Sequence, residues 1–365
     1  MKQNRLIVGL FFVLIIVMLN GCSDSNPVDS ADQGPELVTV EDMAGREVAI
    51  PSSIDKVYAT SATGSVMLYT LAPEKLAGWN TTLREHEKKY INPIYYNLPD
   101  LGRWKGSSPT GSIEDLLKTG PDVIISVGDV SVQYVSDAES IEDQTGIPVL
   151  MVDGSLSGTA KAYRFVGDLL DESDRAEELA IYCEKTFNEI DRCLKEIPEG
   201  DRVKVYYAEG IEGLETDVKG TVNSEAIDLA GAINVADPGT GDAARRIQVS
   251  MEQLMVWDPE VIIVSVDADT THEVYNKMLN GETWKNIQAV QDGQVYEIPC
   301  EPYDWINRPP SIVRLIGVQW LTNILYPDAS SIDFTQEVAE FFNVFFDYEL
   351  SEEAVNQILE RSQHI

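Results

Sequence analysis

Histidine and cysteine are scarce in this sequence, and they form no metal-binding cluster. The three histidines, His86, His272 and His364, lie far apart and lack the spacing of a zinc site. No Cys-x-x-Cys motif occurs. Cys183 and Cys193 are ten positions apart in a segment predicted to be helical, which places them about 15 Å apart, too far for a disulfide. We therefore expect no bound metal ion and no cofactor.

Positive charge is also scarce. The chain has 27 lysines and arginines against 61 acidic residues, a net charge of −34. Residues 1–21 contain two cations and no anions, so without them the charge is 25 minus 61, or −36. A surface this acidic repels nucleic acid and anionic lipid, which excludes both as expected partners. An anionic ligand is still possible where arginines gather locally.

The motifs of common enzymes are missing. The sequence has no P-loop, no Gly-x-Ser-x-Gly and no His-Glu-x-x-His. Gly239-Thr240-Gly241 is similar to a dinucleotide-binding loop, but it follows no strong strand and its third position is Ala244. We therefore do not expect an enzyme.

The longest apolar run, residues 6–19, is too short to span a bilayer. Lys2 and Arg5 precede it, which is typical of a secretory signal. The run ends in Leu19-Asn20-Gly21-Cys22, which resembles a bacterial or archaeal lipobox, although Asn20 departs from its pattern. We predict a signal peptide at 1–21 and lipidation of Cys22, with an uncleaved N-terminal anchor as the alternative. In both cases the rest of the chain lies outside the cell membrane.

The polar residues after Cys22 contain almost no apolar side chains, so the segment 22–36 is predicted to be a flexible tether. The remaining residues, about 330, suffice for two domains.

One sequence pattern occurs twice, at 112–127 and at 250–265, without a gap and 138 positions apart (250 minus 112). Each copy has a serine at a helix N-cap, a glutamate in the first turn, a short apolar helix, a proline and a run of valine and isoleucine. The repeat predicts two similar α/β lobes. It places one carboxylate, Glu114 or Glu252, at the same position of each lobe.

Strands that alternate with helices predict mostly parallel sheets. We expect an N-terminal lobe at 37–156, one long linking helix at 157–197 with a possible kink near 171–174, and a C-terminal lobe at 198–365. The expected strands are 56–60, 76–79, 122–127, 147–152, 203–207, 260–265 and 294–298. The expected helices also include 62–71, 112–118, 222–230, 250–256, 311–325 and two terminal helices packed on the C-terminal lobe.

The chain resembles the iron-complex and cobalamin class of substrate-binding proteins of ABC importers over residues 37–347. The resemblance rests on the two glutamate motifs, the linking helix, the lipobox, Leu101-Gly102-Arg103-Trp104, and Tyr303-Asp304-Trp305 with Arg308-Pro309-Pro310-Ser311. It implies two lobes joined by a rigid helix, a ligand cleft between them and modest closure. It also implies that Glu114 and Glu252 pair with arginines of the transporter's two membrane subunits.

The family positions that face the ligand are the loops after the sheet strands. They nominate these residues: Thr63, Ser65, Arg84, Arg103, Trp104, Gly128, Asp129, Tyr207, Glu209, Gly210, Arg245, Arg246, Trp305 and Arg308. Aromatic rings could wall a flat macrocycle or a catecholate, and arginines could bind carboxylates or oxyanions.

The resemblance implies a monomeric lipoprotein receptor that delivers a metal chelate, such as a ferric siderophore, haem or a corrinoid, to a permease with its ATPase. A second possibility on the same fold is a bare oxyanion, molybdate or tungstate. An extracytoplasmic enzyme or metallocluster-handling protein, and a signalling or adhesion lipoprotein without a role in import, are the alternatives of other classes.

Overall fold

The structure, a computed structural model, describes residues 36–104, 109–237, 239, 246–265, 272–330 and 332–363. The predicted signal peptide, Cys22 and the predicted tether up to residue 35 lie outside these residues. Among the described residues, no helix combines the length and the apolar character needed to cross a membrane.

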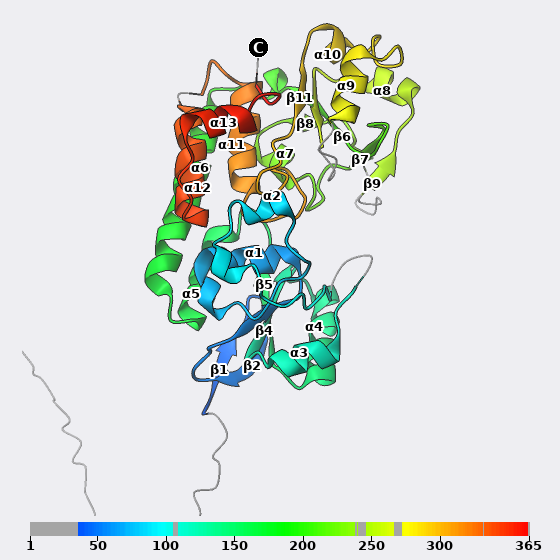
Figure 1. Ribbon diagram of the computed structural model, residues 1–365. Helices are drawn as coiled ribbons and strands as arrows, with labels where there is room; N and C mark the ends of the chain where they lie inside the picture. Colours follow the sequence, from blue (N-terminus) through cyan, green and yellow to red (C-terminus); the bar gives the residue numbers. More distant parts are fainter. Residues whose placement is uncertain are drawn as a thin grey trace, which may run out of the picture. The chain divides into compact units, whose positions relative to one another are not determined.

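The first lobe contains a three-stranded parallel sheet, in the order β3-β4-β5. Its strands are buried along nearly their whole length, as expected where helices cover both faces of a parallel sheet. An antiparallel hairpin precedes the sheet and was not predicted (Figure 1). The elements are β1 Leu37–Glu41, β2 Glu47–Pro51, β3 Val57–Ala59, α1 Ala62–Leu71, η1 Pro73–Lys75, α2 Glu85–Lys88, η2 Pro93–Tyr95, α3 Ile113–Thr119, β4 Val123–Gly128, α4 Val132–Thr145 and β5 Val149–Asp153.

The second lobe contains a four-stranded parallel sheet, in the order β11-β10-β6-β8, and a short antiparallel pair, β7 with β9. The predicted fold class, α/β with mostly parallel sheets in two lobes, is therefore confirmed. The elements are η3 Glu199–Asp201, β6 Lys204–Ala208, β7 Glu215–Asp217, α7 Glu225–Leu229, β8 Ile233–Asn234, β9 Arg246–Gln248, α8 Met251–Trp257, β10 Val261–Val264, α9 Glu273–Asn280, α10 Gln288–Gln291, β11 Val295–Glu297, α11 Arg314–Leu325, α12 Phe334–Phe346 and α13 Glu352–Ile358.

The repeated sequence folds the same way in both lobes. The Ser112 hydroxyl accepts a hydrogen bond from the backbone N–H of Asp115 (3.3 Å), and Ser250 accepts one from Gln253 (3.2 Å). These caps start α3 and α8, each of seven residues. Each helix ends at a left-handed residue followed by proline, and each then leads into a buried strand, β4 or β10.

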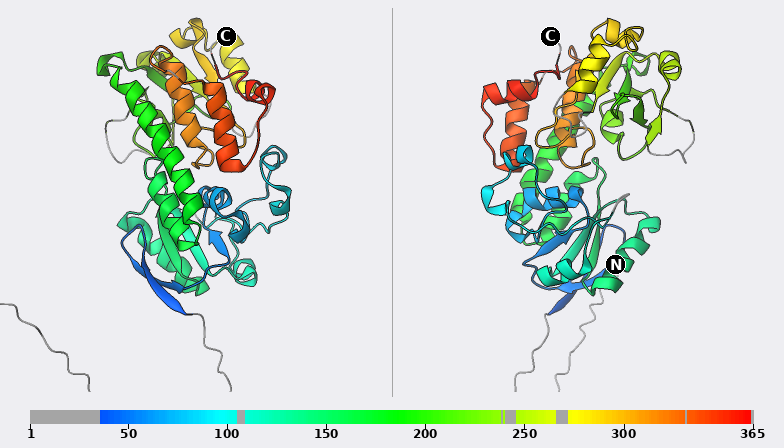
Figure 2. Two further views of the ribbon diagram at one scale, coloured as in Figure 1. Left: turned by 90° about the vertical axis from the view of Figure 1, so that its left-hand side faces the viewer. Right: turned by 45° about the vertical axis from the view of Figure 1, so that its right-hand side comes forward.

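The predicted linking helix is two helices, α5 Thr159–Leu169 and α6 Ser173–Lys195, which corrects the prediction of one continuous helix. The chain turns back at Asp171, whose φ of 59° is left-handed, near the predicted kink. The sequence shows no proline there, and both helices bury an apolar face, so the helical periodicity continues across the break. Only α6 extends along both lobes (Figure 2).

Close packing of α5 on α6 depends on Gly167. A Cβ added at this glycine would lie 2.2 Å from the Cβ of Ala176, so no side chain fits between the two helices. Cys183 and Cys193 both lie on α6, as predicted, and both are buried free thiols.

The penultimate helix, α12, packs on both lobes rather than on the second lobe alone, which corrects that prediction. Rings of the first lobe meet its inner face: Tyr90 lies 5.0 Å from Phe342 and Tyr163 lies 6.1 Å from Phe345, between ring centroids. From the other side, Lys185 of α6 forms ion pairs with two glutamates of α12. The sequence predicted that the phenylalanines of this helix pack against the protein, but it did not predict that residues of the first lobe cover them.

Three further predicted segments differ in length or type from the observed elements. The expected strand at 76–79 forms only two isolated bridges, Val57 with Leu76 and Trp79 with Asp100, because Trp79 pairs with the following loop instead of the sheet. The helix expected at 222–230 is limited to α7, and the 81–108 loop contains the short helix α2. Helices α4, α9 and α10 were not predicted.

A buried ion pair joins the two lobes where β5 ends. Arg314, in the first turn of α11, bonds to Glu225 of α7 (3.0 Å) and donates to the carbonyl of Gly154 (3.2 Å). Glu225 in turn accepts from the backbone N–H of Leu156 (2.9 Å). The Arg314 side chain is 2% exposed, and burial lowers its pKa. One charged pair therefore connects the end of β5 to both α7 and α11.

We predict that Gly167→Ala destabilises the protein by about 1–3 kcal/mol, because α5 and α6 must move apart to admit the new methyl group. The control is Gly200→Ala, where nothing lies within 4 Å of the added Cβ. Urea unfolding midpoints measure both changes. Equal midpoints for the two variants would show that the close approach at Gly167 is unimportant.

We also predict that Glu225→Gln costs about 3–5 kcal/mol, because it leaves the Arg314 charge buried without a countercharge. Glu282→Gln is the matched control: it removes an exposed partner of Lys285 and should cost about 0–1 kcal/mol. The same urea titration compares them, and a loss no larger for Glu225→Gln than for the control would refute the importance of the pair.

Candidate functional site

The carboxyl ends of the second lobe's strands meet a loop that starts after β11. Glu209 follows β6, and Ser265 follows β10. The Ser265 hydroxyl donates to Asp304 of this loop (2.9 Å). Asp304 also accepts from the backbone N–H groups of Ile306 (2.8 Å) and Asn307 (3.0 Å). These bonds fix the loop, and with it Arg308, against the edge where parallel sheets bind ligands.

Two of the nominated arginines converge on one buried carboxylate. Glu209 has no exposed side-chain surface, and its carboxylate forms an ion pair with Arg308. The Nε of Arg246, at the start of β9, lies 3.6 Å from the other Glu209 oxygen and 2.9 Å from Glu215. The side chains of Arg246 and Arg308 are 31% and 34% exposed. Glu209 therefore holds two guanidinium groups that remain accessible from solvent.

The environment of Glu209 raises its pKa to about 7. Burial is the largest cause, and the charge of Asp217 on β7 adds to it. The hydrogen bond and the charge of Arg308, and the charge of Arg246, act in the opposite direction. Asp217 is itself buried and accepts a hydrogen bond from Asn307 (3.2 Å). Near neutral pH, Glu209 therefore lies close to its titration midpoint.

Two nominated aromatic residues lie in the core of this structure. Tyr207 and Trp305 are both 0% exposed. The indole N–H of Trp305 donates to the carbonyl of Glu301 (2.8 Å), and its ring meets Phe334 edge-on at 6.2 Å. Burial raises the pKa of Tyr207 well above its usual value. A ligand could touch these rings only if the loop moved.

On the first lobe, Thr63 and Ser65 differ in their surroundings. Thr63 is half-buried in the first turn of α1. Ser65 is buried, and its hydroxyl donates to Asn80, which in turn donates to the carbonyls of Ala59 and Gly102. Ser65 therefore supports the loops beside the site. The first turn of α1 has no acidic residue and no side-chain cap, so its N–H groups suit an anion.

Arg103 and Trp104 lie beside the end of β3. The backbone N–H of Trp104 donates to the carbonyl of Thr60 (3.0 Å), and its half-buried ring packs on Gly111. Arg103 is also half-buried, and its Nε has no hydrogen-bond partner among the described residues. Arg103 and Trp104 therefore remain partly exposed beside a strand end, as expected for residues that face a ligand, whereas Tyr207 and Trp305 do not.

Among the described residues, the remaining nominated ones have partners outside the group formed by Glu209, Arg246 and Arg308, except Gly210, which follows Glu209 in the chain. Arg84 forms an ion pair with Glu87 (2.7 Å). Asp129, which follows Gly128, accepts a hydrogen bond from the backbone of Ser131 (2.7 Å). Arg245 lies outside the described residues. Gly210, with φ of 74°, makes the turn after Glu209.

Sequence reasoning missed the roles of Glu225, Arg314 and Asp217. An arginine inside the otherwise uncharged and mostly apolar run 311–325 was the available signal for Arg314, because such a residue is buried only with a partner. No comparable signal marked Asp217. Of the buried carboxylates, only Glu209 had been nominated, as a neighbour of Tyr207.

The two glutamates of the repeat are both exposed in the first turn of their helices. Hydrogen bonds from its own backbone N–H and from Ser250 lower the pKa of Glu252. Each helix also exposes large apolar side chains, Ile113 and Leu117 on α3, and Met255 and Val256 on α8. The helices thus present a carboxylate beside apolar surface at equivalent places.

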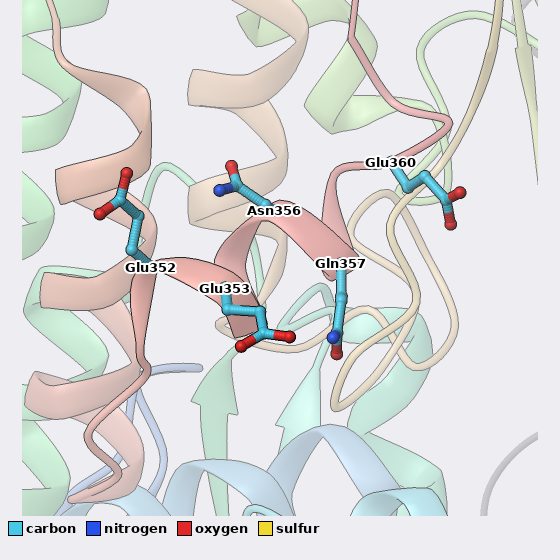
Figure 3. A pocket seen from close by; sticks show the side chains of 5 residues that line it. All are labelled: Glu352, Glu353, Asn356, Gln357 and Glu360. Carbon is cyan, nitrogen blue, oxygen red and sulfur yellow. The ribbon is translucent and has the colours of Figure 1, made fainter.

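A surface hollow of about 580 Å³ lies over α13, lined by Glu352, Glu353, Asn356, Gln357 and Glu360 (Figure 3). Its three carboxylates disfavour an anion, and it contains none of the nominated residues. Across the described ranges, no group of three or more His, Cys, Asp or Glu side chains is arranged to hold a metal ion.

Comparison with known proteins agrees with this architecture. Residues 57–302 match the family model described as periplasmic binding protein. The structure of an ABC transporter solute binding protein from Sulfurospirillum deleyianum is similar, with a TM-score of 0.80 and 29% identity, covering 88% of this chain and 99% of that one. The vitamin B12 binding protein BtuF of Vibrio cholerae shares the fold at a TM-score of 0.57 and 18% identity, covering 76% and 100%.

A curated relative, the molybdate-binding protein MolA of Haemophilus influenzae, is 25% identical over 333 residues, 84% of this chain and 90% of its own. Its molybdate-bound structure matches with a TM-score of 0.68 at 22% identity, covering 86% and 99%. The family and these neighbours are transport binding proteins, not enzymes, and the family implies a location outside the cytoplasm. The chain belongs to the periplasmic binding protein family and is a substrate-binding protein of an ABC importer.

Proposed function

We propose that this receptor captures an oxyanion, molybdate or tungstate, and delivers it to an ABC permease with its ATPase. The observation that carries the proposal is the pair of accessible arginines, Arg246 and Arg308, held at the carboxyl edge of the second lobe's sheet. Guanidinium groups bind oxyanions through paired, charge-assisted hydrogen bonds. The similarity to a molybdate-binding protein along most of both chains supports the same ligand class.

Burial of the aromatic residues supports this ligand over a metal chelate. Haem, a corrinoid or a ferric catecholate would need flat apolar contact surfaces. Of the three aromatic residues expected to supply them, Tyr207 and Trp305 have no exposed surface, and Trp104 is half-buried. A compact anion needs donors instead, and the two arginines provide them. We therefore favour the oxyanion over the siderophore, haem or corrinoid that the sequence resemblance suggested.

We propose that the first lobe completes the site with Thr63, the free N–H groups at the start of α1, and Arg103. Arg84, Trp104, Gly128 and Asp129 would lie farther from the anion. Ser65 is left out because its buried hydroxyl is already bonded to Asn80.

Arg308→Met should weaken molybdate and tungstate binding by about 10–100-fold, because a lost hydrogen bond to a charged group costs about 1.5–3 kcal/mol. Arg246→Met should have a similar effect. Arg192→Met is the control, since it removes an exposed arginine of α6. Isothermal titration calorimetry of the purified chain without residues 1–21 measures all four proteins.

The same titration should include a ferric siderophore, haem and cobalamin. Tight binding of any of these, with no heat from molybdate or tungstate, would reject the oxyanion proposal and restore the chelate. Unchanged oxyanion affinity in both arginine variants would place the site elsewhere.

We propose that Glu114 and Glu252 dock the receptor on its transporter. Two exposed carboxylates at the starts of capped helices, one per lobe, form a fixed pair of charges. Charges arranged in this way steer the encounter of two proteins and fix their orientation. Arginines of the two membrane subunits would be their partners.

The double variant Glu114→Ala/Glu252→Ala should lose most of its binding to the permease complex in detergent or nanodiscs, while its affinity for the ligand stays unchanged. The control, Glu139→Ala/Glu349→Ala, removes two other exposed carboxylates. Surface plasmon resonance compares the three receptors. Equal permease binding by both double variants would end the docking proposal.

We further propose that the mature receptor is a monomer attached to the membrane by a lipid on Cys22, with the tether at 22–36 leaving the lobes free to reach the permease. The division into lobes at 37–156 and 198–365 around the connecting segment 157–197 also stays a proposal.

A further inference from the structure

Glu209 already bonds the two arginines that the proposed oxyanion needs. Its carboxylate forms the ion pair with Arg308 and lies 3.6 Å from Arg246. An anion that binds these guanidinium groups therefore competes with Glu209 for the same donors. Because the Glu209 side chain is fully buried, it cannot turn to solvent when it loses them.

The charges around Glu209 make a displaced carboxylate unfavourable. From β7, Glu215 and the buried Asp217 face the same arginine-rich region. From the loop after β11, Asp304 contributes another buried carboxyl group beside Tyr207. The only cations close to Glu209 among its described partners are Arg246 and Arg308. Adding a doubly charged oxyanion would leave an excess of negative charge beside the buried Glu209 carboxylate.

The other buried acidic groups are bonded to groups other than the two arginines. One oxygen of Asp217 accepts a hydrogen bond from Asn307, and Asp304 accepts three hydrogen bonds. Glu215 is half-exposed and reaches solvent. Burial raises the pKa values of Tyr206 and Tyr207, so both phenols are neutral at physiological pH. Glu209 is the group whose bonding must change when Arg308 turns to a ligand.

We propose that capture of the oxyanion is coupled to the uptake of one proton by Glu209, which gives up Arg308 to the ligand. Glu209 then acts as a positioning residue: it keeps the two guanidinium groups in place and becomes neutral when the anion takes them over. This inference rests on the proposed oxyanion function.

The direction of the pH effect follows from the bonds that change. In the structure, Arg308 and Arg246 lower the pKa of Glu209, and its value is about 7. An anion that engages the arginines removes this stabilisation of the carboxylate and adds negative charge nearby, so the pKa rises on binding. The bound form then holds more protons, and affinity increases as pH falls, by up to about tenfold per pH unit above about pH 7.

The test is calorimetry of molybdate and tungstate binding at about pH 8 in buffers with different ionisation enthalpies, which counts protons taken up per ligand. Wild type should take up close to one proton and lose affinity by roughly tenfold per unit of rising pH. Glu209→Gln mimics the protonated side chain, so this variant should take up almost no protons when the oxyanion binds. Its oxyanion affinity should change little with pH and should be at least as high as that of wild type at about pH 8.

Glu215→Gln is the matched control, because it neutralises the half-exposed partner of Arg246 and should retain the proton uptake. Thermal unfolding checks that both variants fold. The number of protons taken up by wild type tests the inference even if a variant does not fold. Oxyanion binding without proton uptake would overturn this inference and leave the proposed function intact. No oxyanion binding at any pH would overturn both.

Discussion

The buried pair of Glu225 and Arg314 is the constraint on which the arrangement of the two lobes depends. It buries a full positive charge, which is tolerated because Glu225 and the carbonyls of Gly154 and Val222 bond the two terminal nitrogens of the guanidinium group. Glu225 also bonds the backbone at Leu156. One ion pair thereby anchors the chain where it leaves β5, next to the segment that leads into the helices joining the lobes.

The helices reinforce that anchor. α6 extends along both lobes (Figure 2), and α12 lies beside it with its phenylalanines turned to rings of the first lobe. A wide hinge motion would have to break the ion pair and expose these rings. The same principle operates at the carboxyl edge of the second lobe's sheet, where buried Glu209 fixes two arginines in a chain that is otherwise strongly acidic. In both places an ion pair with a carboxylate positions a guanidinium group.

How far the sequence could predict this structure depended on the kind of signal. The serine caps, the valine and isoleucine runs and the 138-residue offset correctly predicted α3 with β4 and α8 with β10, because those signals are local. The turn at Asp171 was not predicted as a break, since a left-handed aspartate between two amphipathic helices leaves the periodicity intact.

The candidate site was less accessible to local signals. Arg246 and Arg308 were nominated from the family resemblance, and the structure brings both to Glu209. Whether a residue next to a strand end faces the ligand or the core depends on packing between distant segments. That packing buries Tyr207 and Trp305, and it pairs Glu209 with arginines that lie 37 and 99 positions away along the chain (246 minus 209 and 308 minus 209). The proposed ligand changed accordingly, from a metal chelate to a small anion.

The most direct test of the account is anomalous X-ray diffraction from crystals of the receptor grown with tungstate. The account predicts a tungsten peak whose oxyanion accepts hydrogen bonds from Arg308 and Arg246, with the first turn of α1 facing it from the other lobe. A tungsten position that contacts neither arginine, or a fully occupied site elsewhere on the protein, would contradict it.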